Sequence, residues 1–136
     1  MKPVVQEEKT GCAITTSAAI AGVSYEEAKK IANSKGIYAE DSALWSKTNN
    51  IRKLLAIFGI KSANKKVPFR SWESLPDCAL LSIKWHIENG KPYWHWVVFV
   101  REFDQSYVLD SKKTLKTNIR TDFGRMKPQW YVEVKA

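Results

Sequence analysis

A cysteine and a histidine in this sequence can form a nucleophile–base pair. Cys12 follows Thr10-Gly11 and opens a run of small residues, Cys12–Ala21, in which apolar positions recur at helical spacing. Backbone N–H groups at the start of a helix carry partial positive charge, which stabilises a thiolate. Cys12 is therefore a candidate nucleophile if a base lies nearby, and otherwise a small buried residue opening a tightly packed helix.

The candidate base is His95, which lies within the apolar and β-branched segment Tyr93–Val100. A histidine in such a segment needs hydrogen-bond partners for its ring nitrogens. It is either a core histidine bonded to a carbonyl group or a base that takes the thiol proton and forms a thiolate–imidazolium pair. His86 is the other histidine, and its position beside the polar turn Glu88-Asn89-Gly90 predicts an exposed side chain.

Gln6 precedes Cys12 in a polar loop. Its side-chain amide could donate to the oxygen that becomes negative when a thiolate attacks a carbonyl, with the Cys12 N–H as the second donor. Such a donor typically lowers the barrier by ~3 kcal/mol. Without a thiolate nearby, a loop glutamine is merely solvated.

Asp110 ends the strand predicted after His95, and its carboxylate could accept a hydrogen bond from the second imidazole nitrogen. The hairpin between the two strands decides whether they meet. A two-residue loop at Glu102-Phe103 brings His95 and Asp110 opposite each other. A loop from Phe103 to Ser106 displaces Asp110 by ~13 Å along the strand.

The second cysteine, Cys78, follows Pro76-Asp77 and leads into an apolar strand, which indicates a core position. Two cysteines do not make a disulfide framework. The two histidines and two cysteines also lack the close spacing of a structural zinc site. The sequence therefore predicts no metal centre.

The net charge is +8, and much of it gathers near the C-terminal end. The cluster contains one acid, Asp122, and six cations: Lys112, Lys113, Lys116, Arg120, Arg125 and Lys127. A solvated surface is the favoured interpretation, with nucleic acid, an anionic polymer or an acidic protein as other possible partners. Because no nucleic-acid module signature accompanies the charge, we do not expect nucleic acid to be the partner.

The sequence pattern predicts helices in the first half of the chain and strands in the second half. Gly22 ends the first helix, Ser24 and Glu27 form a capping box for a second that ends at Gly36, and a third covers 49–58. Strands are expected over 79–85, 93–100, 107–109 and 130–134, with a hairpin turn at Asn89-Gly90. This order predicts an α+β fold with helices packed on one face of an antiparallel sheet.

Residues 1–136 are expected to form a single domain, because no repeat, low-complexity tract or Gly/Ser linker interrupts them. The apolar stretches are too short to cross a bilayer, and charges follow Met1 almost at once, leaving no apolar signal core. A cytoplasmic location is the default expectation. A domain excised from a larger secreted protein would look the same.

Taken together, these motifs resemble the papain-like cysteine peptidases, and specifically the C39-like branch related to bacteriocin-leader processing peptidases. The resemblance is carried by Gln6-x5-Cys12 at the first helix, by His95-Trp96-Val97-Val98 in a strand, and by Asp110 after the next strand. It implies a papain-like fold, a peptide or protein substrate and no metal or organic cofactor. The implied roles are nucleophile for Cys12, base for His95, orienting acid for Asp110 and oxyanion donor for Gln6.

Three positions depart from the family pattern. Such peptidases usually carry an acid before the cysteine and a glycine after it, where this chain has Gly11 and Ala13. Proline often follows the acid, where this chain has Ser111. A double-glycine leader is therefore not carried over as the substrate. A papain-like amidase or deamidase effector domain and a catalytically silent papain-like binding module stay open as alternatives.

Overall fold

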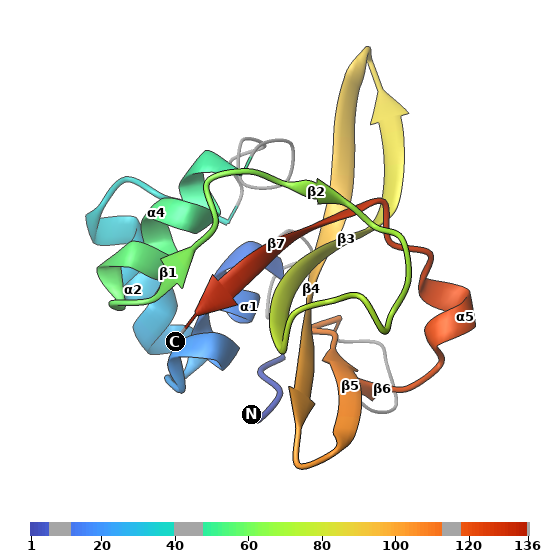
Figure 1. Cartoon of the computed structure of the whole chain (residues 1–136). Helices are drawn as coiled ribbons and strands as arrows, with labels where there is room; N and C mark the ends of the chain where they lie inside the picture. Colours follow the sequence, from blue (N-terminus) through green and yellow to red (C-terminus); the bar gives the residue numbers. More distant parts are fainter. Residues whose placement is uncertain (6–11, 40–47, 113–117, 136) are drawn as a thin grey trace.

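The computed structural model describes residues 1–5, 12–39, 48–112 and 118–135. Within these ranges the chain forms helices first and an antiparallel sheet afterwards, as the sequence predicts (Figure 1). The helices are α1 (Cys12–Ala21), α2 (Tyr25–Ser34), α4 (Asn49–Ile57) and the short α5 (Phe123–Met126). The strands are β1 (Lys61–Ser62), β2 (Val67–Pro68), β3 (Cys78–Glu88), β4 (Lys91–Glu102), β5 (Gln105–Leu109), β6 (Ile119–Arg120) and β7 (Trp130–Lys135).

The three longer helices begin and end close to where the sequence predicts. Ser24 is the N-cap of α2, where its hydroxyl accepts a hydrogen bond from the Glu27 N–H at 3.1 Å. Gly22 follows α1 at φ +74°, a left-handed conformation that glycine adopts without a Cβ penalty. In α1 every residue from Cys12 to Ile20 is buried, so its small side chains allow close packing on all sides.

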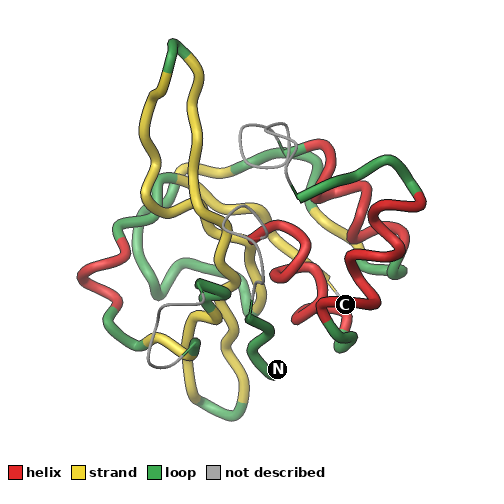
Figure 2. The backbone as a smooth tube through the Cα atoms, turned by 180° about the vertical axis from the view of Figure 1, so that it is seen from behind, coloured by secondary structure: helices red, strands yellow, loops and turns green. Residues whose placement is uncertain are grey.

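The sheet is built from antiparallel pairs in the order β1-β7-β3-β4-β5-β6, with β2 also paired to β7. The long β3–β4 hairpin extends beyond the rest of the sheet in both views (Figures 1 and 2). Its two-residue turn is formed by Asn89 at φ 50° and Gly90 at φ 78°. Positive φ at both positions is the geometry for which Asn-Gly is favoured, and the predicted hairpin is confirmed.

The β4–β5 hairpin differs from both predicted loops. Glu102 pairs with Gln105, so the turn consists of Phe103 and Asp104, which have φ values of 52° and 64°. Neither residue is the glycine that usually occupies such positions, and nothing in the local sequence separates this turn from its neighbours. Both expected registers are therefore wrong, and the observed one lies between them.

Two buried clusters lie on the two faces of the sheet. The larger one contains α1, α2 and α4 together with even-numbered residues of β4, among them Trp94, Trp96 and Val98. The smaller one contains Val97, Phe99 and Met126 of α5. The expectation that helices cover one face is thus correct for three helices and wrong for α5, which packs on the other face (Figure 1).

Three tryptophans form an edge-to-face group in the larger cluster. The ring centroids of Trp94 and Trp130 are 4.9 Å apart, and those of Trp96 and Trp130 are 5.3 Å apart. Such pairs add attraction beyond the area that they bury. The group ties β4 to β7 beneath the helices. Among the described helices, none combines the length and apolarity needed to cross a membrane.

Candidate active site

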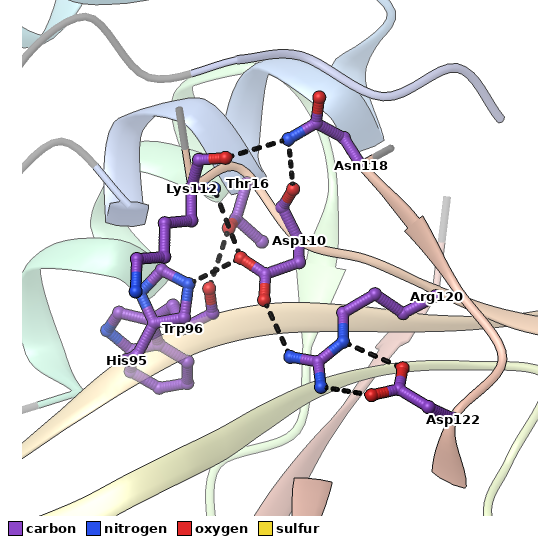
Figure 3. A network of polar contacts seen from close by, with 8 residues as sticks. All are labelled: Thr16, His95, Trp96, Asp110, Lys112, Asn118, Arg120 and Asp122. Atoms are coloured by element: carbon purple, nitrogen blue, oxygen red, sulfur yellow. Dashed lines mark hydrogen bonds and ion pairs between the residues drawn. The ribbon is translucent and has the colours of Figure 1, made fainter. Parts of the chain in front are cut away.

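His95 and Asp110 are in direct contact (Figure 3). The His95 Nε2–H donates a hydrogen bond to Oδ1 of Asp110 at 2.7 Å. The two side chains are 15% and 0% exposed, so the contact is shielded from water. Asp110 immediately follows β5 and His95 lies on β4, as expected from the sequence. The expected contact between them is confirmed.

Cys12 is the first residue of α1 and is 4% exposed. Its thiol lies near the His95 ring, where it helps to set the pKa of that ring. Because Nε2 is engaged by Asp110, Nδ1 is the ring nitrogen left for the sulfur. A second contact helps to place α1 against this strand, since the Thr16 hydroxyl donates to the carbonyl of Trp96 at 3.5 Å. The structure thus brings Cys12, His95 and Asp110 together in that order.

The electrostatics of this group favour a charged histidine. Burial opposes a charge on His95, but the hydrogen bonds with Asp110 and Cys12 outweigh it and raise the pKa of His95 to about 9. Burial likewise opposes ionisation of Asp110, but the hydrogen bond and charge of His95 lower the pKa of Asp110 to about 2. At neutral pH the pair is therefore an imidazolium beside a carboxylate, with the thiol on the far side of the ring.

The Asp110 carboxylate has partners other than His95. Oδ2 accepts a hydrogen bond from Nη1 of Arg120 at 3.1 Å, and Oδ1 also accepts one from the Lys112 backbone N–H at 3.1 Å. The Asn118 side-chain amide donates to the Asp110 carbonyl at 2.7 Å. Arg120 is itself held by Asp122 through contacts of 2.9 and 2.6 Å (Figure 3). Asp110 is thus fixed from several directions.

These supporting residues are not identified as such from the sequence, where Lys112 and Arg120 are only members of the basic cluster. One signal points toward them. A fully buried carboxylate needs partners for both oxygens, and one histidine can satisfy only one of them. Arg120 precedes Asp122 by two residues, and in the structure its guanidinium bonds both Asp122 and Asp110.

Further positive charge lies beside the acid. Lys84 has φ 55° within the irregular part of the β3–β4 pairing, between Ile83 and His86. Burial, followed by a side-chain contact with Lys112 and the charge of that residue, lowers the pKa of Lys84. The Lys84 and Lys112 side chains therefore lie close together near Asp110.

The remaining candidate residues are placed as follows. Gln6 lies outside the described residues. His86 is exposed, as expected, and lies 3.4 Å from a carboxylate oxygen of Glu88. Cys78 is half-buried at the start of β3 and packs against the larger cluster. Burial and then the charge of Glu102 raise the pKa of the Cys78 thiol to about 11, which keeps it protonated and unreactive at neutral pH.

The described residues contain no group of three or more His, Cys, Asp or Glu side chains placed to hold a metal ion. Cys12, His95 and Asp110 instead form a linear chain of contacts, with the ring between sulfur and carboxylate. Such a chain can move a proton from sulfur to the ring and hold the resulting cation.

No protein-family model matches this sequence, and no curated protein sequence matches it either. Among solved structures, the chain is similar to a double-glycine motif protease from an AMS/PCAT transporter, whose crystal structure was determined in complex with the leader peptide. The TM-score is 0.59 and the sequence identity 16%, and the match covers 98% of this chain and 90% of that one. The chain therefore shares its fold with a double-glycine motif protease.

Proposed function

We propose that this protein is a cysteine-dependent hydrolase of peptide or related amide bonds, with a papain-like, C39-like site. The single observation that carries the proposal is the chain of contacts from Cys12 through His95 to Asp110. Cysteine at a helix start supplies the nucleophile, His95 the base and Asp110 the group that orients the ring. The shared fold with a peptidase that was crystallised with a leader peptide supports a peptide as the substrate class.

The reaction proceeds in two steps. The Cys12 thiolate attacks the carbonyl carbon, and the negative oxygen is stabilised by the Cys12 N–H and the Gln6 amide. His95 gives its proton to the leaving amine, which departs as the C–N bond breaks and leaves a thioester on Cys12. Water then attacks the thioester while His95 takes its proton, and the proton returns to the sulfur as the acid is released.

Asp110 does not exchange a proton in this cycle. Its hydrogen bond to Nε2 keeps the Nδ1 nitrogen directed at the sulfur and stabilises the imidazolium. Burial of the carboxylate strengthens this effect, because the low local dielectric increases the attraction between the two charges. Gly11, Ala13 and Ser111 depart from the pattern of leader peptidases, so double-glycine specificity is not part of the proposal.

Peptide cleavage by the purified protein tests the proposal. A mixture of fluorogenic peptides is incubated with the wild type and with Cys12→Ser, His95→Ala and Cys78→Ser. We expect turnover in the wild type and in Cys78→Ser, and losses of ~1000-fold or more in the other two, because one loses the nucleophile and the other its base. Equal turnover in the wild type and Cys12→Ser would contradict the proposal. Peptide binding without any turnover in the wild type would identify a silent binding module instead.

A further inference from the structure

A groove lies at the start of α4. It is an open groove bordered by the first turns of that helix, the connection between β1 and β2, and the outer part of β4, and has a volume of about 550 Å³. Its lining includes Asn49, Arg52, Lys65, Lys66, Pro92 and Trp94. None of these residues belongs to the Cys12, His95 and Asp110 group.

Two N–H donors in the lining of this groove have no acceptor among the residues that the structure describes. Trp94 is 5% exposed, and its indole Nε1 is buried without a hydrogen-bond partner. The Nε of Arg52 is buried in the same way, while Nη1 of that residue donates to the carbonyl of Asn64. Buried donors are nearly always paired, because an unpaired one loses its hydration without compensation. Two such donors in one groove point to a ligand that brings oxygen acceptors.

The positive charge of the groove indicates that its ligand is an anion. Arg52, Lys65 and Lys66 contribute three cations, and no acid is among its described lining residues. The Lys66 ammonium lies 5.0 Å from the ring centroid of Trp130, which holds that charge beside the groove. An oxygen ligand that is also negative forms charge-assisted hydrogen bonds, which are stronger than neutral ones.

The size and apolar walls of the groove favour an organic ligand over a free inorganic anion. A volume of about 550 Å³ lies within the range of small-molecule and peptide-side-chain sites and far exceeds one carboxylate group. Pro92 is exposed and provides apolar surface in the lining, to which the buried Trp94 adds a small part. The ligand that fits has an anionic head and an apolar stem.

We propose that this groove binds a carboxylate carried by a peptide, with the Trp94 indole N–H and the Arg52 guanidinium as its donors. The aliphatic part of the acidic residue packs on Pro92, and Lys65 and Lys66 attract the charge. The choice of a peptide rests on the proposed function, whereas the choice of a carboxylate rests on the groove. Trp94 directly precedes His95 on β4, with its side chain on the opposite face, so the groove would select an acidic residue in a peptide long enough to occupy both the groove and the active site.

Calorimetric titration of the Cys12→Ser protein tests the proposal without hydrolysis of the ligand. Three peptides differ in one feature: a glutamate peptide with an amidated C-terminus, its glutamine counterpart, and the glutamine peptide with a free C-terminal carboxylate. We expect the glutamate peptide to bind at least ~10-fold more tightly than its amidated glutamine counterpart at physiological salt. If the glutamine peptide with a free C-terminal carboxylate binds more tightly than the glutamate peptide, the groove binds the C-terminal carboxylate of a peptide instead of an acidic side chain.

Two variants tie the effect to this groove. Trp94→Phe removes the N–H and keeps an aromatic wall, and Lys65→Gln removes one charge from an exposed position. We expect each to reduce the preference for the carboxylate by ~5–10-fold. Lys53→Gln is the matched control, because Lys53 is exposed on α4 and lies outside the groove, and we expect no change. If Trp94→Phe lowers the thermal unfolding midpoint too far for titration, the test rests on comparing the carboxylate preference of Lys65→Gln with that of Lys53→Gln.

Equal affinity for the glutamate and amidated glutamine peptides would overturn the proposal. So would equal losses in Lys65→Gln and Lys53→Gln, which would indicate general attraction to a basic protein. Inorganic phosphate that displaces the glutamate peptide at equal concentration would also overturn it, since the groove would then be a phosphate site. Carboxylate binding in a protein that hydrolyses no peptide would leave the groove assigned and the proposed function refuted.

Discussion

Asp110 reaches His95 at 2.7 Å although the two residues are not paired across their strands. The described β4–β5 pairing includes Val98 with Leu109, and one further step places Asp110 opposite Val97. Val97 and His95 are two residues apart, so their side chains leave β4 on the same face. Asp110 is therefore a diagonal neighbour of His95, a relationship that allows long side chains to meet. The contact depends on the two-residue turn at Phe103-Asp104.

The first prediction concerns the reactivity of Cys12 as a function of pH. Because hydrogen bonds raise the pKa of His95 to about 9, the ring is a cation at pH 6–7 and stabilises a neighbouring thiolate. We expect iodoacetamide to alkylate Cys12 at pH 6 at least ~30-fold faster in the wild type than in His95→Ala. Both proteins also carry Cys78→Ser, so that the measured alkylation comes from Cys12 alone.

Above pH 9 the ring loses its proton, and the difference between the two proteins is expected to shrink. Identical alkylation profiles with an ordinary thiol titration in both would mean that no thiolate–imidazolium pair forms. The fold would then be used for binding alone.

The second prediction concerns stability against pH. The pKa of His95 is raised from 6.5 to about 9, so its contribution to stability is complete below pH 6.5 and is lost as the pH rises through 9. The pKa of Asp110 is lowered from 3.8 to about 2, so its contribution is complete above pH 3.8 and is lost as the pH falls through 2. Both contributions are present together between about pH 4 and 6.5.

Asp110→Asn removes this ion pair and keeps the size of the side chain. We expect the variant to unfold with a free energy about 3 kcal/mol lower than that of the wild type at pH 5.5, because a buried charged partner is lost. Urea unfolding from pH 5 to 10 measures the difference, which should decrease between pH 6.5 and 9. A difference that stays constant over this range would show that the His95 charge does not contribute.

The third prediction concerns Gln6, whose role as oxyanion donor remains a proposal. Gln6→Ala should lower kcat by ~100-fold, because the donor acts on the developing negative oxygen. The alkylation rate of Cys12 should stay within about twofold of the wild type, because the thiolate itself is stabilised by His95. Gln6→Glu serves as a second variant and should be at least as impaired. Loss of both turnover and thiol reactivity would indicate a structural role.

Much of the site could be predicted from residue types and their order. The small-residue run after Gly11 marks α1, and Asn89-Gly90 marks the hairpin that precedes His95 on β4. The contact between His95 and Asp110 could only be predicted conditionally, because its distance depends on a turn without glycine. Positive φ at Phe103 and Asp104 is imposed by strand pairing on either side, which no local pattern records.

Other elements could not be predicted, since their stability is tertiary in origin. The strands β1, β2 and β6 contain two residues each, too few for any periodicity. The helix α5 has four residues and is held by burial of Met126 against the far face of the sheet. The role of Arg120 is equally non-local, because its acid partner Asp110 is ten residues earlier and follows another strand, β5.

The last prediction concerns Arg120, which holds Oδ2 of Asp110 while Oδ1 serves His95. Arg120→Ala leaves this oxygen of a fully buried carboxylate without its charged partner. We expect a loss of about 1–3 kcal/mol in the free energy of unfolding, which is typical for a buried acceptor that loses its donor. We also expect kcat to fall ~10-fold with little change in KM, because a loosened carboxylate orients the imidazole less well.

Arg125→Ala is the matched control, since it removes the same charge from an exposed position in α5. It should leave both kcat and the free energy of unfolding unchanged. Arg120→Lys keeps the charge but not the planar guanidinium that joins Asp110 to Asp122, so it should restore only part of the loss. If Arg120→Ala and Arg125→Ala lower kcat equally, the effect comes from overall charge. Arg120 would then not position the acid.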